Sequence, residues 1–400
     1  MTSYLNPEDA QRLFRSHLTP IRRVERVSLG RAAGRVLAED IRAPHDWPPF
    51  ARAAMDGFAF HSRDCPGTLH VQGTVHAGET WSKPLAPGQA VRIMTGAPIP
   101  SGADTVLEQE AVLDGEDIFV SQPVKTGRNI MVSGHEYRAG DPVVRARTWL
   151  TPLSLGQLAA LGIQDVPVVD ALRVLILVTG DEIQSQPGPL APGRVYDANG
   201  PLLSALLQTE GARVTLRHAP DQPKRILSIL QQAARADRWD LVVATGGVSV
   251  GRKDYLPALL EEHFTRLFWR LNLHPGKAAA GALLAPQLPL LALSGNPGAA
   301  LTAWYLIGRP LALWLAQKHD PPRRIRGRLQ AAYPKPTREA RYLKAKFLAD
   351  GHEWVFSLID NQSSDALRSF AEADGLVMIP AGSGPVEAGT VLDGLWLPHP

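Results

Sequence analysis

Apolar and polar positions alternate with different periods in successive parts of the chain. Up to about residue 169, helical patterns at 7–17 and 152–161 are mixed with short strand-like runs that Gly and Pro separate. We expect this first part to be irregular and rich in β-structure.

From about residue 171 to residue 318, the pattern becomes regular. Apolar strands at 172–178, 241–244 and 288–293 alternate with helical stretches at 200–211, 226–236 and 299–315. Nearly continuous apolar strands between helices indicate a mostly parallel sheet that is covered on both faces. The pattern therefore predicts a doubly wound α/β domain.

After Pro321-Pro322 the chain returns to strands. Residues 341–358 predict a hairpin that turns at Asp350-Gly351, followed by a helix at 364–373 capped by Ser364. Further strands are expected at 376–379 and 391–397. We predict a small β-rich, barrel-like domain at the C-terminus.

The length and composition set wide limits on function. Four hundred residues suffice for two or three domains with sizeable cores. The 42 basic and 39 acidic side chains leave a net charge of only +3, so the surface is mixed in charge. Nothing in this balance indicates a nucleic-acid partner.

Cys65 is the only cysteine, which excludes an internal disulfide and is typical of the cytoplasm. The first residues lack the apolar core of a signal peptide. The most apolar long window, 299–316, is interrupted by Gly308-Arg309-Pro310. We therefore expect a cytoplasmic location and no membrane segment.

Three expected strands of the α/β part run into glycine turns, in "LILVTGDEI", "LVVATGGVSVGRKDY" and "LLALSGNPGAA". The carboxyl ends of parallel strands meet at one edge, where loops and helix N-termini expose unpaired N–H groups. Gly246 and Gly247 permit a close approach of ligand to backbone. One such turn is common for steric reasons, but three together indicate a pocket for phosphate or another oxyanion.

Two nucleotide-binding motifs are excluded. Gly246 and Gly251 have the glycine spacing of a P-loop, but Arg252 stands where that motif has lysine. In addition, no G-x-G-x-x-G follows a strand, which argues against a Rossmann dinucleotide site.

Asp181, Glu182 and Asp254 lie on the turns that should attract anions. A carboxylate repels a phosphate unless a divalent cation lies between them, so the set predicts Mg²⁺. For Asp181 or Asp254 alone, capping of the following helix is an equally good interpretation, but it explains the set less well.

The stretch "FWRLNLHPGKAAAGAL" combines apolar and cationic positions. With a period of two, its apolar residues face one side and Arg270, Asn272 and His274 face the other. Such a stripe is often only the solvated face of a strand. Because Lys277 and Lys253 both lie beside glycine turns, we favour anion binding for Lys277.

Two loops of the N-terminal part also carry polar residues. Asp56 lies in "AAMDGFAF", and Thr95 and Asp104 lie in "RIMTGAPIPSGADTV". Taken alone, all three are better explained as turn residues, because Asp and Thr side chains readily bond to nearby backbone.

The order of these segments resembles a known family. The segments "RVLAEDI", "AMDGFA", "MTGAPIPSGADTV", "TGDEI", "DANGPLLSALL", "TGGVSVGRKDY", "HPGKAAAG" and "SGNPGAA" are similar in sequence and spacing to those of the molybdopterin molybdenumtransferases, the MoeA and gephyrin E-domain proteins. The resemblance runs from about residue 29 to residue 397.

The resemblance implies a specific reaction. Members of that family take adenylylated molybdopterin and molybdate, cleave the phosphoanhydride in a divalent-metal-dependent step, insert molybdenum into the pterin dithiolene and release AMP. It therefore implies Mg²⁺ as cofactor and molybdate as substrate. It also implies contacts with the upstream adenylyltransferase and with acceptor molybdoenzymes.

The resemblance also implies roles for individual residues. Asp56, Thr95, Glu182, Asp254 and Lys277 are expected to be catalytic, with Glu182 and Asp254 holding the metal. The residues expected to bind substrate lie mainly at the strand ends and in the cationic stretch: Thr179, Gly180, Asp221, Thr245, Gly246, Gly247, Ser249, Gly251, Arg270, His274, Ser294, Gly295, Asn296 and Pro297.

Four positions depart from the family pattern. Where this chain has Arg270 and His274, the family often has lysine. It often has proline in place of Ser294 and aspartate in place of Glu136. Because a histidine is largely neutral near pH 7 unless a partner raises its pKa, we expect molybdate affinity to depend on pH.

The family resemblance implies an elongated homodimer, in which Asp56 and Thr95 of one subunit meet Asp254 of the other. The implied domains are 1–45 with 137–170 (a discontinuous linker and dimer domain), 46–136 (β-rich), 171–320 (a MogA-like sheet domain) and 321–400 (barrel-like).

Two rival functions are a molybdopterin adenylyltransferase, which resembles the sheet domain alone, and a non-catalytic gephyrin-like scaffold. The long flanking segments argue against the first rival. The presence of Asp56, Glu182 and Asp254 argues against the second.

Overall fold

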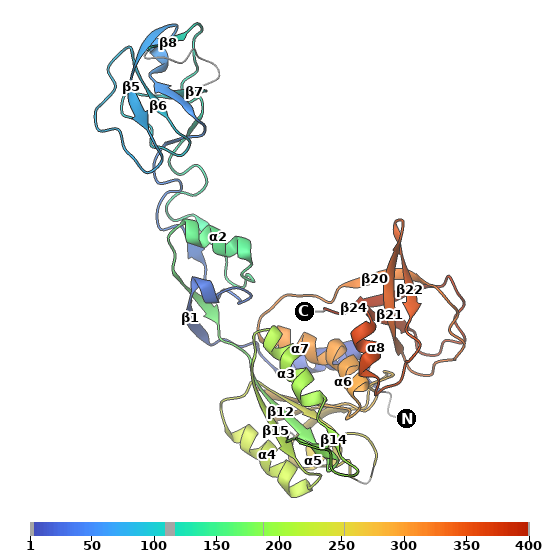
Figure 1. Cartoon of the computed structure of the whole chain (residues 1–400). Helices are drawn as coiled ribbons and strands as arrows, with labels where there is room; N and C mark the ends of the chain where they lie inside the picture. Colours follow the sequence, from blue (N-terminus) through green and yellow to red (C-terminus); the bar gives the residue numbers. More distant parts are fainter. Residues whose placement is uncertain (1–3, 109–116, 187, 252, 399–400) are drawn as a thin grey trace. The chain divides into compact units, whose positions relative to one another are not determined.

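The computed structural model describes residues 4–108, 117–186, 188–251 and 253–398. The chain forms two compact units. One comprises Met1–Arg26, Gly34–Val36 and Pro167–Pro400, and the other Val27–Ala33 and Leu37–Val166 (Figure 1). The division into four domains remains a prediction.

The first unit is built on a six-stranded sheet. Its strands, in spatial order, are β15 (Arg213–Ala219), β12 (Arg173–Thr179), β16 (Leu241–Thr245), β19 (Leu288–Leu293), β18 (Ala280–Ala285) and β17 (Thr265–Trp269). The first four are parallel, and β18 and β17 are antiparallel additions. This confirms the predicted mostly parallel sheet. The sequence pattern missed β15, an edge strand whose residues are mostly half-buried or exposed.

Helices cover both faces of this sheet, as predicted (Figure 1). On one face, α4 (Pro223–Arg235) and α5 (Leu256–His263) bury their apolar sides against β12 and β16. On the other face lie α3 (Asn199–Thr209), α6 (Pro297–Ala303) and α7 (Arg309–Leu315). The central strands are buried on both sides, which explains their continuous apolar sequences.

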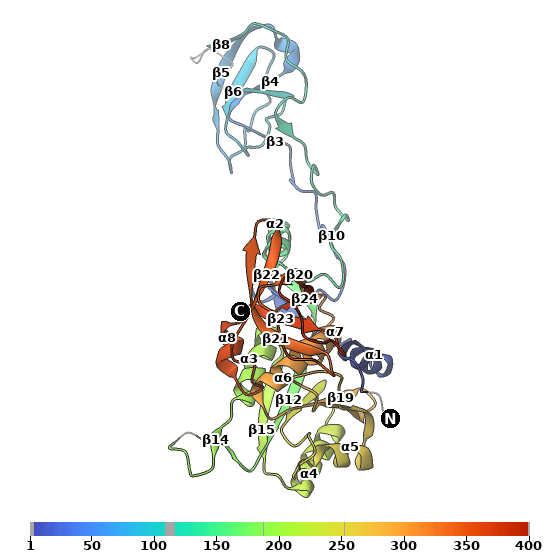
Figure 2. The same ribbon diagram turned by 90° about the vertical axis from the view of Figure 1, so that its right-hand side faces the viewer.

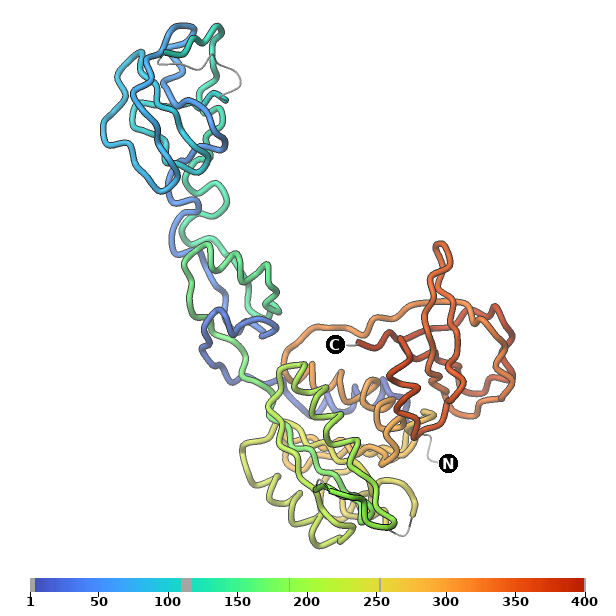
Figure 3. Tube along the Cα trace, in the orientation of Figure 1, coloured from blue at the N-terminus to red at the C-terminus, as the bar shows by residue number. Residues whose placement is uncertain are grey.

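The first helix, α1 (Pro7–His17), belongs to this unit and lies beside α7 (Figure 3). Its Phe14 meets Phe268 of β17 edge-on, with the ring centroids 5.7 Å apart. The helix spans the residues that the sequence pattern predicted.

A π-helical turn (η4, Trp304–Gly308) joins α6 to α7. Pro310 lacks the N–H of a regular helix and its ring crowds the carbonyl four residues earlier, which the wider turn relieves. Across the described residues, no helix has both the length and the apolar character needed to cross a membrane.

The C-terminal segment closes into a five-stranded barrel, which confirms the predicted β domain. Its strands in spatial order are β20 (Arg324–Leu329), β22 (Glu353–Leu358), β21 (Arg341–Asp350), β23 (Gly375–Ile379) and β24 (Val391–Trp396). Phe347 and Phe356 lie in its core, with their ring centroids 4.8 Å apart. The hairpin turns between Asp350 and Glu353, as predicted.

The helix after this hairpin is shorter than predicted. It is α8 (Leu367–Glu372), and no side chain caps its N-terminus, so the predicted cap by Ser364 is wrong. Ser364 instead bonds to the first turn of α6, where its carbonyl accepts from the Ala299 amide at 3.0 Å. Figure 2 shows α8 beside α6.

The second unit is irregular and β-rich, as predicted. A five-stranded sheet has the order β7 (Thr105–Glu108), β4 (Gly57–Phe60), β6 (Gln89–Ile93), β5 (Gly67–Val75), β8 (Asp117–Val120). The helix α2 (Pro152–Ala160) is capped by Thr151, whose hydroxyl accepts from the Ser154 amide.

The remaining short elements form pairs or single turns. They are β1 (Val24–Ser28) with β11 (Asp165–Val169), β2 (Ile41–Arg42) with β10 (Pro142–Val144), β3 (Arg52–Ala53) with β9 (Ile130–Met131), β13 (Ile183–Gln184) with β14 (Val195–Tyr196), η1 (Leu29–Arg31) and η2 (Ser62–Asp64).

The packing around the π-helical turn makes a first prediction. A Cβ on Gly308 would lie 2.2 Å from the buried ring of Trp304. Gly308→Ala should therefore lower the free energy of unfolding by about 1–3 kcal/mol, measured by urea denaturation. The control is Gly156→Ala in α2, where a Cβ meets no atom within 4 Å. It should be neutral or stabilise by up to about 1 kcal/mol. Equal effects of the two substitutions would contradict the packing argument.

Candidate active site

The carboxyl ends of β12, β16 and β19 come together at one edge of the sheet. The strands stop at Thr179, Thr245 and Leu293, and glycines follow the first two. A Cβ on Gly246 would lie 2.3 Å from the Thr179 carbonyl oxygen, and the φ of Gly246 is 93°. Only glycine permits this close contact between neighbouring strand ends.

A cleft of about 570 Å³ opens over these strand ends. It brings together most residues that were predicted for the site. These are Thr179, Gly180, Glu182, Asp221, Gly246, Gly247, Ser249, Asp254, His274, Lys277, Ser294, Gly295 and Asn296. The cleft is also lined by Lys253, Pro275, Gly276 and Ser364, which the predicted set did not contain.

Four predicted residues of the same unit do not line the cleft: Thr245, Gly251, Arg270 and Pro297. Thr245 lies beneath it, where its hydroxyl donates to the Ser294 carbonyl at 3.1 Å. Arg270 points to the N-terminal segment and donates to the Tyr4 hydroxyl at 3.2 Å.

Asn199, which the prediction omitted, links two of the strand ends. Its side-chain amide donates to the Thr245 hydroxyl at 2.7 Å and to the Gly295 carbonyl at 2.8 Å. Asn199 is only 7% exposed, so these bonds form away from solvent. The segment "DANGPLLSALL" was part of the family resemblance, but its local sequence reads only as a helix start.

Two buried oxygens near the strand ends lack a hydrogen-bond partner among the described residues: Oγ1 of Thr179, which lines the cleft, and Oδ1 of Asn199, which does not. A buried polar group without a partner costs about 1–3 kcal/mol. A water molecule or a polar ligand atom would satisfy them.

Carboxylates gather on one side of the cleft. Glu182 folds back over Gly180, where a Cβ would lie 2.8 Å from its carboxylate oxygens. Asp181 pairs with Lys253 at 2.7 Å and accepts from the Asp221 amide at 3.1 Å. Burial raises the pKa of Asp221, and the charges of Asp181 and Glu182 add to this rise. This side therefore carries concentrated negative charge.

Asp254 does not cap the helix that follows it. The helix α5 begins after Tyr255 without any side-chain cap, so the alternative interpretation of Asp254 as a helix cap is wrong. Its Oδ2 instead accepts from the Gly251 amide at 2.6 Å, within the loop.

Cationic groups lie on the opposite side. The ammonium of Lys277 is 2.6 Å from Glu339 Oε1. His274 is exposed, but partial desolvation and the nearby charges of Arg341 and Lys277 lower its pKa, against the opposing effect of Glu339.

The predicted cationic strand does not extend this far. The strand β17 ends at Trp269, and Arg270 has a φ of 69°, so the regular strand stops there. The predicted alternation still holds beyond it, because Leu271 and Leu273 are buried while Asn272 and His274 are more exposed.

A second cavity of about 790 Å³ adjoins the cleft from the barrel side. The two share His274 and Ser364. Its other polar residues include Tyr333, Lys335 and Arg341. The first unit therefore offers two connected spaces with different surroundings.

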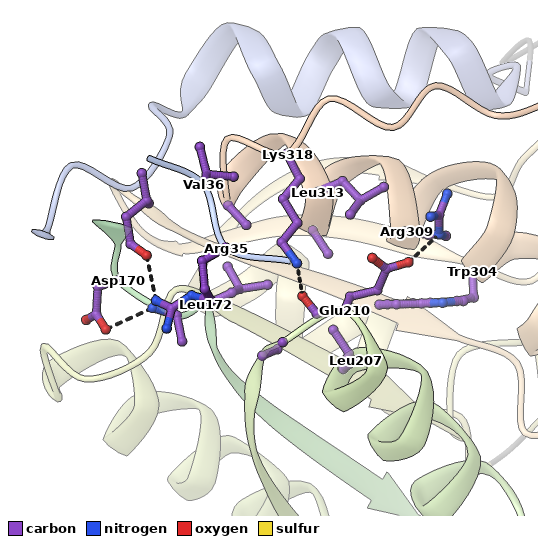
Figure 4. A pocket seen from close by; sticks show the side chains of 16 residues that line it. Arg35, Val36, Asp170, Leu172, Leu207, Glu210, Trp304, Arg309, Leu313 and Lys318 are labelled. Carbon is purple, nitrogen blue, oxygen red and sulfur yellow. Dashed lines mark hydrogen bonds and ion pairs between the residues drawn. The ribbon is translucent and has the colours of Figure 1, made fainter. Parts of the chain in front are cut away.

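A more enclosed cavity lies elsewhere, between α3 and α7 (Figure 4). There the Lys318 ammonium donates to the Glu210 carbonyl, and Arg309 Nε donates to the Glu210 carboxylate at 2.8 Å. With a volume of about 20 Å³, it is large enough for roughly one water molecule. It is therefore not a substrate site.

Asp56 and Thr95 lie in the second unit and bond to each other. Asp56 Oδ1 accepts from both the amide and the hydroxyl of Thr95, each at 2.7 Å. These bonds lower the pKa of Asp56. Asp104 accepts from the Ser62 amide at 2.6 Å, and because Ser62 lies 42 residues earlier in the sequence, this is not the local turn bond that was predicted.

Comparison with known proteins agrees with the order of these elements. Residues 5–162 match the family model described as MoeA N-terminal region (domain I and II). Residues 175–313 match a probable molybdopterin binding domain, and residues 326–395 the MoeA C-terminal region (domain IV). The molybdopterin molybdenumtransferase of Staphylococcus aureus (strain COL) is 31% identical over 378 residues, which is 92% of this chain and 90% of that protein. The chain belongs to the MoeA family.

Other members support this assignment. The molybdopterin molybdenumtransferase of Synechococcus elongatus is 34% identical over 389 residues, covering 92% of this chain and 94% of that protein. The crystal structure of a MoeA protein from Pyrococcus horikoshii matches 98% of this chain and 99% of its own, with a TM-score of 0.83 and 28% identity. The MoeA matches on both sides of the sheet exclude the smaller adenylyltransferase as an alternative.

The buried bonds of Asn199 predict a structural effect in this MoeA-family chain. Asn199→Ala leaves the Thr245 hydroxyl and the Gly295 carbonyl without their donor, so the free energy of unfolding should fall by about 1–3 kcal/mol in urea denaturation. Ser204→Ala is a matched control in the same helix, because the Ser204 hydroxyl donates to the Gly200 carbonyl of that helix. It should change stability by less than about 0.5 kcal/mol. A loss of similar size in both variants would argue against the link.

Proposed function

We propose that this chain is a molybdopterin molybdenumtransferase that inserts molybdate into adenylylated molybdopterin and releases AMP. The observation that carries the proposal is the cleft over three strand ends, with carboxylates on one side and Lys277 on the other. The named MoeA relatives, 31–34% identical over most of the chain, support the same reaction.

The glycine turns suit the pyrophosphate of such a substrate. Gly180, Gly246 and Gly247 have φ values of 149°, 93° and 63°, and none carries a side chain that would block its amide. Backbone N–H groups at strand ends and helix N-termini bind phosphate oxygens. An adenylylated pterin has two bulky ends, and two connected cavities could hold one each.

The acidic side of the cleft fits Mg²⁺ that is shared with substrate. Among the described residues, no group of three His, Cys, Asp or Glu side chains could hold a metal by itself. Mg²⁺ commonly takes one or two carboxylates and completes its shell with phosphate oxygens and water. We propose that Glu182 and Asp254 hold it, and when bound it would neutralise phosphate charge.

Lys277 is the proposed cation for molybdate, with Arg341 nearby on the barrel. An ammonium and a guanidinium both bind tetrahedral oxyanions through charge-assisted hydrogen bonds. Because the pKa of His274 is lowered, this residue should add positive charge only in acidic solution.

The proposal includes a homodimer and a cytoplasmic location. Asp56 and Thr95 would complete the cleft from a second subunit, as in the family pattern. The cytoplasmic location, the upstream adenylyltransferase and the acceptor molybdoenzymes remain predictions.

Release of AMP tests the proposed reaction. Purified protein, adenylylated molybdopterin, Mg²⁺ and molybdate should yield AMP above a protein-free control. Asp254→Asn should slow this release by about tenfold or more, with little change in melting temperature, because the residue lies on a loop. Asp350→Asn, at the tip of the barrel hairpin, is the matched control and should release AMP at the wild-type rate. Wild-type protein that stays folded but releases no AMP would favour the non-catalytic scaffold.

The lowered pKa of His274 predicts the direction of a pH effect. The ordinary pKa of histidine is about 6.5, and a lower value keeps the ring neutral between about pH 7 and pH 8. Molybdate affinity should therefore be flat in that range and rise only in more acidic solution, as the ring becomes protonated. His274→Lys should bind more tightly near neutral pH and lose this dependence. Isothermal titration calorimetry would measure both, and a wild-type affinity that rises between pH 7 and pH 8 would contradict the assignment.

A further inference from the structure

Lys277, the proposed oxyanion cation, already has a carboxylate partner. Glu339 Oε1 lies 2.6 Å from the Lys277 ammonium. The side chain of Glu339 is 27% exposed and that of Lys277 is 38% exposed. The ammonium also lies 4.6 Å from the centroid of the Tyr4 ring. The pair is therefore partly shielded from water, where its attraction is stronger than on an open surface.

Backbone bonds hold the two partners at this distance. The His274 amide donates to the Ala340 carbonyl at 2.8 Å, and the Tyr342 amide donates to the His274 carbonyl at 2.8 Å. These bonds connect the segment before β21, which carries Glu339, to the loop that carries Lys277. The pair is consequently built into the connection between the barrel and the sheet.

An oxyanion at Lys277 would meet the charge of Glu339. The hydrogen bond from Lys277 lowers the pKa of Glu339, so this carboxylate is ionised at neutral pH. Two anions within about 4 Å of one ammonium repel each other strongly in a partly buried site. An incoming oxyanion must therefore displace the carboxylate or bind weakly.

We propose that Glu339 is an internal competitor for the oxyanion at Lys277. Its carboxylate occupies the ammonium in the empty cleft and leaves it when a dianion such as molybdate or sulfate binds. A monoanion such as nitrate carries no more charge than the carboxylate and does not displace it. Glu339 thus sets both affinity and selectivity for dianions. The inference rests on the proposed function only in taking Lys277 as the oxyanion cation.

Direct binding to the full-length chain tests this inference. Calorimetric titrations with molybdate, sulfate and nitrate would compare the wild type with Glu339→Gln, which keeps a similar shape but removes the competing charge. The variant should bind both dianions about threefold to tenfold more tightly, and nitrate binding should improve by a larger factor.

Two further variants serve as controls. Glu339→Asp keeps the charge and should bind as the wild type does. Glu353 lies on the barrel hairpin, where its carboxylate is 2.7 Å from the Arg328 guanidinium. Glu353→Gln removes this ion pair and should also leave oxyanion binding unchanged. In a Lys277→Ala background, Glu339→Gln should no longer improve dianion binding, because the contested cation is gone.

Several results would overturn the inference. If Glu339 only anchors Lys277, Glu339→Gln should weaken dianion binding or leave it unchanged. An equal gain for nitrate and for the dianions would remove the proposed selectivity. The inference would also be overturned if neither the wild type nor Glu339→Gln bound any of the three oxyanions. The titrations measure binding and need no turnover. If the predicted binding changes were seen but no AMP were released, only the proposed function would be contradicted.

Discussion

The close contact between the ends of β12 and β16 is the constraint on which the site depends. The strands run parallel, and Val178 pairs with Thr245, so both chains turn away at the same level of the sheet. A Cβ on Gly246 would lie 2.3 Å from the Thr179 carbonyl oxygen. Asn199 then joins the end of β16 to that of β19. These contacts form the floor on which the charged residues are arranged.

The charges above this floor are separated and largely paired. Lys253 holds Asp181 on the acidic side, and Glu339 holds Lys277 on the cationic side. Pairing orders these long side chains before a ligand arrives, which reduces the entropy lost on binding. It also means that a ligand exchanges existing partners rather than meeting bare charges.

The barrel contributes to the same site through backbone contacts. The His274 backbone bonds to Ala340 and Tyr342 at the start of β21. The Ser364 carbonyl accepts from an amide in the first turn of α6. The cleft therefore includes side chains that lie far apart in the sequence, from Thr179 to Ser364. The C-terminal segment therefore contributes to the lining of the site.

By itself, the sequence determined the fold class and the strand ends. The strand β19 and the helix α1 match the predicted residues, because continuous apolar runs and a 3.6-residue period depend on local pattern. Tertiary structure alone decided which charges face one another. Glu339 carries no local signal, and the local patterns around Ser364 and Asn199 indicated only helix starts, since each of the three acts through a partner that distant parts of the chain supply. The predicted strand through Arg270 ends early for the same reason: the backbone leaves the strand conformation at Arg270, and the Arg270 side chain meets Tyr4 from the other end of the chain.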